Sequence, residues 1–157
     1  MQYFDFAKYN DVDSEIERLY EWQFISENEY NSLDRLALKG FFDSELFERI
    51  KNAKEVKREM RFLTEVPATS IDLTLDKSFE TEQVIIQGAV DACIIEDDGI
   101  VILDFKTDRV GEPSDLTEAY GMQLSIYALA AEKIFKKPVK EKLIYSFALG
   151  KTIKVEE

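Results

Sequence analysis

Two β-rich runs constrain the fold of this chain more than any other feature. They are QVIIQGAVDACIIE at residues 83–96 and IVILDFK at residues 100–106. Asp97, Asp98 and Gly99 join them, and an Asp-Gly pair between alternating apolar residues is a strong hairpin signal. The sequence therefore predicts an antiparallel hairpin over residues 83–106.

Three charged residues interrupt the apolar pattern of this hairpin: Asp91, Asp104 and Lys106. Because a strand alternates its faces with a period of two residues, Asp104 and Lys106 project from the same side. A two-residue turn at Asp98-Gly99 places Asp91 opposite Lys106, and a turn at Asp97-Asp98 places it opposite Asp104. Both registers bring the two carboxylates and the lysine to one face, whereas a three-residue loop does not.

Charges on a buried strand are costly unless they pair with each other or bind an ion. Two converging carboxylates form an oxygen-rich site that suits Mg²⁺ or Mn²⁺. Such an ion binds a phosphate and activates a water molecule, and a nearby lysine positions that water or neutralises developing charge. The alternative interpretation is a structural Asp–Lys salt bridge across two strands.

The remaining pattern predicts helices first, then three strands, a helix and a strand. Helices are predicted over residues 13–25, 27–38, 44–52 and 114–135, the second with Ser26 as N-cap and Glu29 completing a capping box, the last capped by Ser114 or Asp115. Gly40 is expected to stop the second helix. Strands are predicted over 56–66, ended by Pro67, and over 142–148, with a further strand possible in the tail, and residues 68–82 are expected to form a loop with a short turn. The predicted fold class is α/β, with a mixed central sheet flanked by helices.

Composition excludes several kinds of site. The chain has 157 residues, no histidine and one cysteine, Cys93. It therefore lacks His-based catalytic sites, an internal disulfide, and a Cys-ligated zinc or iron–sulfur centre made by this chain alone. No run of about 18 apolar residues predicts a membrane span. The N-terminus is polar and acidic, which excludes a secretory signal and makes an intracellular location the expectation.

The chain has a net charge of −12 and therefore lacks the basic surface that is typical of a stand-alone DNA-binding protein. Either the chain does not bind nucleic acid, or something else holds the substrate near it. The length favours one domain, residues 1–157, with a helical N-terminal part over 1–52 and a core over 55–150.

Three strings at specific distances carry a resemblance to a known family. They are QGAVD at residues 87–91, LDFKTDR at 103–109 and YGMQLSIYA at 120–128. The chain resembles the RecB-type nuclease domain of the PD-(D/E)xK superfamily, in particular the C-terminal nuclease domain of bacterial AddA or RexA helicase–nuclease subunits. The resemblance implies a restriction-endonuclease-like core and a magnesium-dependent deoxyribonuclease, with Mn²⁺ as a substitute ion and no iron–sulfur cluster in this chain.

The resemblance also implies roles for individual residues. Asp91 and Asp104 would bind the metal ion, joined by the backbone carbonyl of Phe105, and Lys106 would be the catalytic lysine. Glu59 matches an acidic residue that often completes the site, with Glu65 a weaker competitor. The residues expected to contact DNA are Gln123, Tyr127, Thr107 and Arg109.

Several of these residues also have a simpler interpretation. Tyr120, Gln123, Tyr127 and Ile134 form one helical stripe, which is usually core, and Tyr120 is expected there. A glutamine in that stripe favours a role in the site. Cys93 is expected to be a small buried residue, and Thr107 and Arg109 either touch phosphate or merely end the strand.

In the family that this chain resembles, an upstream helix carries a metal-binding histidine a few residues before a segment that is similar to residues 1–6. We therefore expect this chain to be a fragment of a larger cytoplasmic bacterial protein, without that ligand and without the helicase part. The expected partners are DNA, the helicase part of the same parent chain and a second subunit of the complex, with no membrane.

Two other functions remain open. The domain could be inactive as this fragment and serve DNA binding or subunit docking, although a decayed nuclease would be expected to lose Asp91, Asp104 or Lys106. It could instead be an acidic protein-interaction domain, which an odd-length turn at residues 97–99 would favour.

Overall fold

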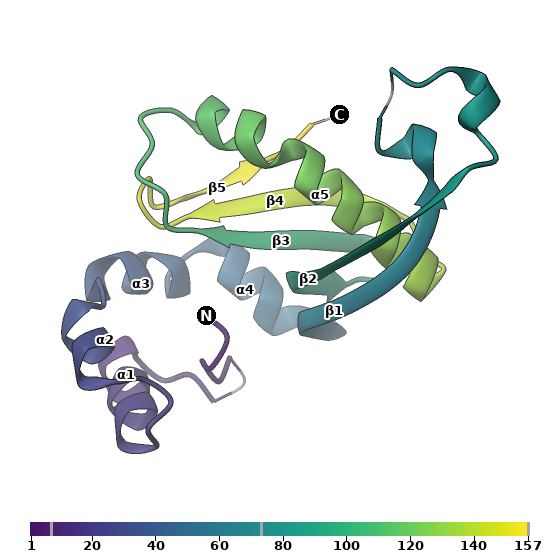
Figure 1. Ribbon diagram of the computed structural model, residues 1–157. Helices are drawn as coiled ribbons and strands as arrows, with labels where there is room; N and C mark the ends of the chain where they lie inside the picture. Colours follow the sequence, from purple (N-terminus) through teal and green to yellow (C-terminus); the bar gives the residue numbers. More distant parts are fainter. Residues whose placement is uncertain (7, 73, 157) are drawn as a thin grey trace.

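The computed structural model describes residues 1–6, 8–72 and 74–156. At its centre lies a five-stranded sheet with the strand order β1-β2-β3-β4-β5 (Figure 1). The strands are β1 (Glu55–Pro67), β2 (Gln83–Ile95), β3 (Ile100–Lys106), β4 (Val139–Ser146) and β5 (Lys151–Lys154). β3 and β4 pair in parallel, and all other neighbours are antiparallel. The sheet is mixed and flanked by helices, which confirms the predicted fold class.

Four short helices precede the sheet: α1 (Val12–Glu21), α2 (Glu27–Ser32), α3 (Arg35–Phe42) and α4 (Glu45–Asn52). The capping box of Ser26 and Glu29 forms at the start of α2 as predicted. The single helix expected over 27–38 was wrong, because Leu33 is extended and the side chain of Asp34 accepts a hydrogen bond from the Ala37 N–H and starts α3.

Gly40 does not stop a helix, contrary to the prediction. It lies inside α3, which continues to Phe42 and buries Leu38, Phe41 and Phe42. A glycine inside a helix costs about 1 kcal/mol. Burying one large apolar side chain contributes about 1.5–3 kcal/mol, so the apolar face of α3 outweighs the local preference of Gly40.

The long helix α5 (Pro113–Phe135) connects the parallel strands β3 and β4. Its N-cap is Glu112, not Ser114 or Asp115, and Pro113 occupies the first turn. Asp115 instead accepts hydrogen bonds from the backbone N–H groups of Gly111 and Glu112. None of the helices within 1–6, 8–72 and 74–156 is long and apolar enough to cross a membrane.

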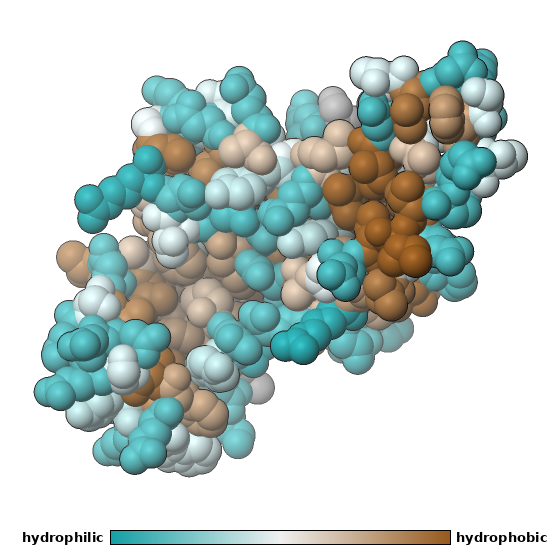
Figure 2. All heavy atoms as spheres, in the orientation of Figure 1, coloured by the Kyte–Doolittle hydropathy of each residue, from teal (hydrophilic) through white to brown (hydrophobic). Residues whose placement is uncertain are grey.

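The segment 68–82 contains two short 3₁₀ helices, η1 (Ala68–Ser70) and η2 (Lys77–Phe79), at the tip of the β1–β2 hairpin. This agrees with the expected loop, apart from residue 73, which lies outside the described residues. Figure 2 shows apolar atoms gathered where this hairpin leaves the sheet beside α5. The exposed apolar side chains of the hairpin include Leu63 and Ile85. The hairpin thus projects as a two-stranded arm with an apolar surface.

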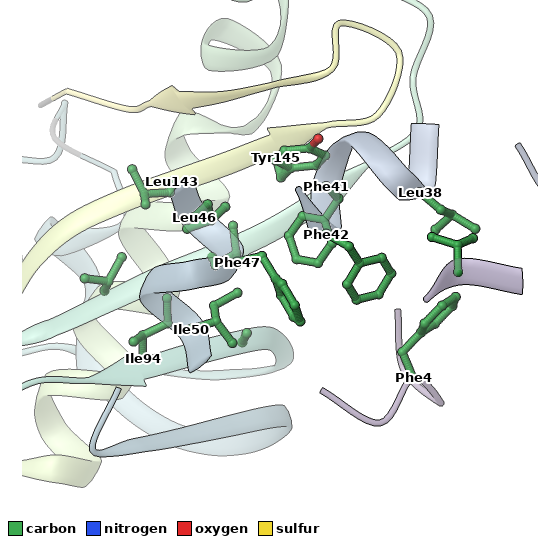
Figure 3. Close-up of a cluster of buried hydrophobic side chains, with 14 of the residues drawn as sticks. Phe4, Leu38, Phe41, Phe42, Leu46, Phe47, Ile50, Ile94, Leu143 and Tyr145 are labelled. Atoms are coloured by element: carbon green, nitrogen blue, oxygen red, sulfur yellow. The ribbon is translucent and has the colours of Figure 1, made fainter. Parts of the chain in front are cut away.

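Two layers of core sandwich the sheet. On one face, α1, α3 and α4 and the N-terminal segment pack against it through an aromatic-rich cluster (Figure 3). Its centre is Phe41, whose ring lies 4.9 Å from the Tyr145 ring and 5.2 Å from the Phe105 ring. On the other face, α5 packs against Ile100 and Ile102 of β3. β3 is therefore buried on both faces, as its apolar sequence predicts.

One ion network ties the helical layer to the sheet. Arg49 of α4 pairs with Glu96, in the turn between β2 and β3, at 2.7 Å, and with Glu141 of β4 at 2.7 Å. The guanidinium donates hydrogen bonds through two nitrogens to each carboxylate. The hydrogen bonds from Arg49, together with a smaller contribution from Lys140, lower the pKa of Glu96 from its ordinary 4.5 to about 2. A depressed carboxyl pKa in the folded state stabilises the protein at neutral pH.

Replacing Arg49 by Met should lower the free energy of unfolding at pH 7 by ~2 kcal/mol, less than the full pKa shift because the pair is partly exposed. The loss should shrink as the pH falls from about 4.5 towards 2, because a protonated Glu96 no longer needs its cation. Urea unfolding at several pH values measures this. Lys51→Met, in the exposed pair with Glu48, is the matched control and should cost less than about 0.5 kcal/mol.

Candidate active site

The strands β2 and β3 pair over only part of their length. The ladder runs from Ile95↔Ile100 to Ala92↔Leu103. The turn is Asp97-Asp98, closed by a hydrogen bond from the Glu96 N–H to the Gly99 carbonyl at 3.0 Å. This even turn continues the register so that Asp91 stands opposite Asp104, one of the two predicted registers.

At Asp91 the ladder opens into a fork. The Phe105 N–H donates to the carboxylate Oδ2 of Asp91 at 2.8 Å, where a continued ladder would use a main-chain carbonyl. Beyond this point β2 and its partner β1 curve away from β3 (Figure 1). The Asp91 side chain therefore bridges the gap between two diverging strands.

At the fork, the regular alternation by which successive side chains of β2 point to opposite faces of the sheet is shifted by one residue. Val90 and Cys93 of β2 both lie in the cluster against α5, although they are three residues apart. On β1, Glu59 has a φ of +50°. Its flanking pairs, Arg58↔Ala92 and Met60↔Val90, keep the same register. Both strands thus slip at the facing positions Glu59 and Asp91.

This slip changes the predicted geometry. Strict alternation predicted that Asp91 shares a face with Asp104 and Lys106, whereas the Asp91 carboxylate points across the fork to the backbone of β3. A positive φ is costly for a non-glycine residue and is held only where the surrounding structure enforces it. The irregular backbone at Glu59 is therefore part of what directs Asp91.

Asp104 and Lys106 form a buried ion pair on the α5 face of β3. Lys106 Nζ lies 2.6 Å from Asp104 Oδ2, and the side chains are 15% and 4% exposed. The contact is not an aligned hydrogen bond, so this Oδ2 atom is buried without a hydrogen-bond partner. Burial raises the pKa of Asp104, and the charge of Asp91 raises it further. Burial alone would lower the pKa of Lys106, but Asp104 outweighs it and the net shift is upward.

Helix α5 supplies three more side chains to this centre. Lys106 Nζ donates to Gln123 Oε1 at 3.4 Å and lies 3.9 Å from the centroid of the Tyr120 ring. Tyr127 packs edge-on against Phe62 at 5.8 Å, and burial raises its pKa, as do the charges of Asp104 and Asp91.

Gly88 allows this packing. A Cβ there would lie 2.9 Å from the Phe62 ring and 3.4 Å from the Tyr127 ring. Position 88 of the QGAVD string is therefore restricted to glycine by the lack of space for a side chain.

Tyr120 is the site residue that sequence reasoning missed. It was expected in the core, and it does pack, half-buried, against the buried cluster around Leu124 and Ile144. Its ring also lies beside Lys106, and its hydroxyl donates to Asp108 Oδ1 at 2.9 Å. Its spacing of three residues before Gln123 places it on the same helix face, and this was the available signal. Ile134, from the same predicted stripe, is 47% exposed.

The other predicted residues lie around this centre or away from it. Glu59 is exposed and faces Asp91, whereas Glu65 lies on the outer part of β1, where its carbonyl accepts a hydrogen bond from Lys133. Thr107 and Arg109 are exposed in the loop after β3. Cys93 is buried as predicted, and burial raises its pKa to about 12.

The N-terminal segment approaches the site from another side. The charges of Asp91 and Glu59 act on the Met1 amine, whose pKa is nevertheless lowered by its burial. Arg58 of β1 donates to the Phe4 carbonyl at 2.5 Å. The segment that begins the chain therefore lies beside Asp91.

The donor set suits a divalent cation only in part. Asp91 and Asp104 interact electrostatically, and the buried Oδ2 of Asp104 makes an ion pair with Lys106 at 2.6 Å but accepts no hydrogen bond. In the part of the chain that the structure describes, no group of three or more acidic or cysteine side chains is placed to hold a metal ion. The residues fit an ion held by two carboxylates, a main-chain carbonyl and water, as Mg²⁺ often is.

Comparison with known proteins gives consistent similarities. Residues 8–156 match the sequence profile of the PD-(D/E)XK nuclease superfamily. The chain is 36% identical over 160 residues to an ATP-dependent helicase/nuclease subunit of Clostridium botulinum, covering 99% of this chain and 12% of that protein. It is 35% identical over 167 residues to the corresponding protein of Clostridium perfringens, covering 100% and 13%. The chain thus spans about an eighth of the length of these relatives.

Among solved structures, the crystal structure of SSO0001 overlaps 91% of this chain and 57% of its own, with 19% identity and a TM-score of 0.42. That likeness is too distant to add to the assignment.

Replacing Lys106 by Met should lower the free energy of unfolding at pH 7 by about 2–3 kcal/mol, because it leaves Asp104 buried without its cation. Adding Asp104→Asn should recover more than half of that loss, since no unpaired charge then remains. Urea unfolding of the single and double variants measures the coupling. Lys57→Met, in an exposed pair with Glu55, serves as control; purely additive losses for the first two changes would contradict the buried pair.

Proposed function

Because the chain belongs to the PD-(D/E)XK nuclease superfamily, we propose that it is the module of a helicase–nuclease that hydrolyses DNA phosphodiester bonds with Mg²⁺ in double-strand break repair and recombination. The observation that carries the proposal is the fork, where the Asp91 carboxylate, bound to the backbone of β3, acts electrostatically on the buried Asp104–Lys106 pair. Nucleases of this superfamily use divalent metal ions. Mg²⁺ is our assignment, with Mn²⁺ as a substitute.

Asp91 and Asp104 would hold the cation, together with the Phe105 carbonyl. When bound, the cation polarises the scissile phosphate and lowers the pKa of a bound water. The hydrogen bond from the Phe105 N–H fixes the direction of the Asp91 carboxylate. A direction fixed before the ion arrives lowers the cost of organising the site.

Lys106 has a different task. Its ammonium already lies beside the carboxylate of Asp104, so it reaches the region where a phosphate would be held. There it orients the attacking water and neutralises the charge that develops on the phosphate. Gln123 keeps the ammonium near the centre by accepting a hydrogen bond from it.

The DNA would approach over the loop after β3 and the first half of α5. Thr107 and Arg109 are exposed there, and Gln123 and Tyr127 line the same side. Residues 1–99 contain 11 Lys and Arg against 23 Asp and Glu, whereas residues 100–157 contain nine of each. The net charge of −12 therefore belongs to residues 1–99, and residues 100–157, which carry this loop and α5, are neutral.

The relatives are named as ATP-dependent helicase/nuclease subunits, which supports a parent chain that contains a helicase and works with a second, partner subunit. Glu59 faces Asp91 and is the candidate for a third acidic group. The alternative is a nuclease-like domain that is inactive in isolation and serves DNA binding or docking. Among the described residues, Glu59 does not form a group of three with Asp91 and Asp104 that could hold an ion, which favours weak metal binding by this domain alone.

Calorimetric titration with Mn²⁺ tests the metal site. Asp104→Asn should weaken binding at least roughly tenfold, because one of two carboxylate ligands loses its charge. Asp98→Asn removes an exposed aspartate that pairs with Lys140 and should leave binding unchanged. Equal affinities of wild type and Asp104→Asn would remove Asp104 from the metal site.

Cleavage of linear single- and double-stranded DNA with Mg²⁺ tests the reaction. Lys106→Ala should reduce the rate at least about 100-fold through loss of charge stabilisation. Lys142→Ala removes a partly buried lysine that donates to Ser125 and should retain cleavage. In a parent chain with a helicase part, Lys106→Ala should abolish cleavage and leave ATP hydrolysis intact. Cleavage by Lys106→Ala at the wild-type rate would refute its role.

A further inference from the structure

Tyr120 packs against a core cluster and also makes two polar contacts. The face of its ring lies 3.9 Å from Lys106 Nζ. Its hydroxyl donates to Asp108 Oδ1 at 2.9 Å. One side chain thus joins three elements, namely β3, the loop that follows it and helix α5.

The ammonium of Lys106 needs such a restraint. Lysine has a long stem with several rotatable bonds and a compact charge, so one ion pair does not fix its position. Asp104 attracts the ammonium from one side at 2.6 Å, while the contact with Gln123 is long at 3.4 Å. The ring of Tyr120 supplies a third contact, and a cation over an aromatic face gains about 0.5–2 kcal/mol.

The hydrogen bond to Asp108 makes the ring a better restraint. It fixes the rotation of the phenol, which its partly exposed position would otherwise leave free. A phenol that donates to a carboxylate also becomes richer in electrons, and this strengthens the attraction of its face for a cation. Asp108 follows Lys106 by two residues, so the loop after β3 holds both ends of the contact.

We propose that Tyr120 is a positioning residue that holds the Lys106 ammonium with its ring face while Asp108 holds the ring. The proposal rests on the catalytic role proposed for Lys106. This role differs from a structural link between the loop and helix α5. Such a link needs only the hydroxyl of Tyr120, whereas positioning of the Lys106 ammonium needs its ring.

The first experiment does not depend on DNA cleavage. In protein with ¹³C-labelled lysine, the ε-methylene protons of Lys106, assigned with Lys106→Arg, should be shifted upfield by the ring. Tyr120→Phe should keep that shift and Tyr120→Leu should lose it. Asp108→Ala, a change of an exposed residue, should reduce it and covers the case in which Tyr120→Leu fails to fold. An unchanged Lys106 signal in both Tyr120→Leu and Asp108→Ala would overturn the proposal.

The second experiment separates binding from turnover. Tyr120→Leu should lower kcat roughly tenfold with KM within about twofold, and Tyr120→Phe should retain at least about a third of kcat. Tyr20→Leu, which changes an exposed tyrosine of α1, should match wild type. Full activity of Tyr120→Leu, or equal losses in Tyr120→Phe and Tyr120→Leu, would contradict positioning by the ring. If wild type itself does not cleave DNA, the proposed function fails, and the Lys106 signal still decides whether the ring holds the ammonium.

Discussion

The hydrogen bond from the Phe105 N–H to the Asp91 carboxylate is the contact on which the rest of the site depends. It occurs where the β2–β3 ladder stops. A backbone donor buried at that point needs an acceptor, and a carboxylate fills the place of the missing carbonyl. The same bond closes the end of the ladder and aims a charged group at the neighbouring strand. At this position the same contact therefore stabilises the sheet and orients the Asp91 carboxylate.

β3 serves both faces of the sheet. Phe105 packs against Phe41 in the aromatic cluster, whereas its neighbours Asp104 and Lys106 lie on the α5 face. The aromatic cluster thus fixes β3 from one face of the sheet, while the Asp104–Lys106 pair lies on the opposite face. Because protein cores are closely packed, the position of the pair depends on rings that never contact it.

The sequence predicted the regular parts of this arrangement. Alternation and the turn residues predicted the hairpin and the shared face of Asp104 and Lys106. They left two even turns and an odd-length turn open, and the structure has the even turn at Asp97-Asp98. They did not predict the direction of Asp91, because the slip depends on a positive φ at Glu59, thirty-two residues earlier in the chain. Nor did they predict that α3 continues through Gly40 or that Tyr120 contacts Lys106 and Asp108, since both depend on tertiary neighbours.

Cys93 lies two residues after Asp91, at the closed end of the fork, and is the sole thiol of the chain. Its burial raises the thiol pKa to about 12, so the folded state hides it from alkylating reagents, which attack the thiolate. Labelling must then await an opening of the sheet at that place. The rate at which Cys93 is alkylated therefore reports how often the β2–β3 pairing at the base of the fork opens.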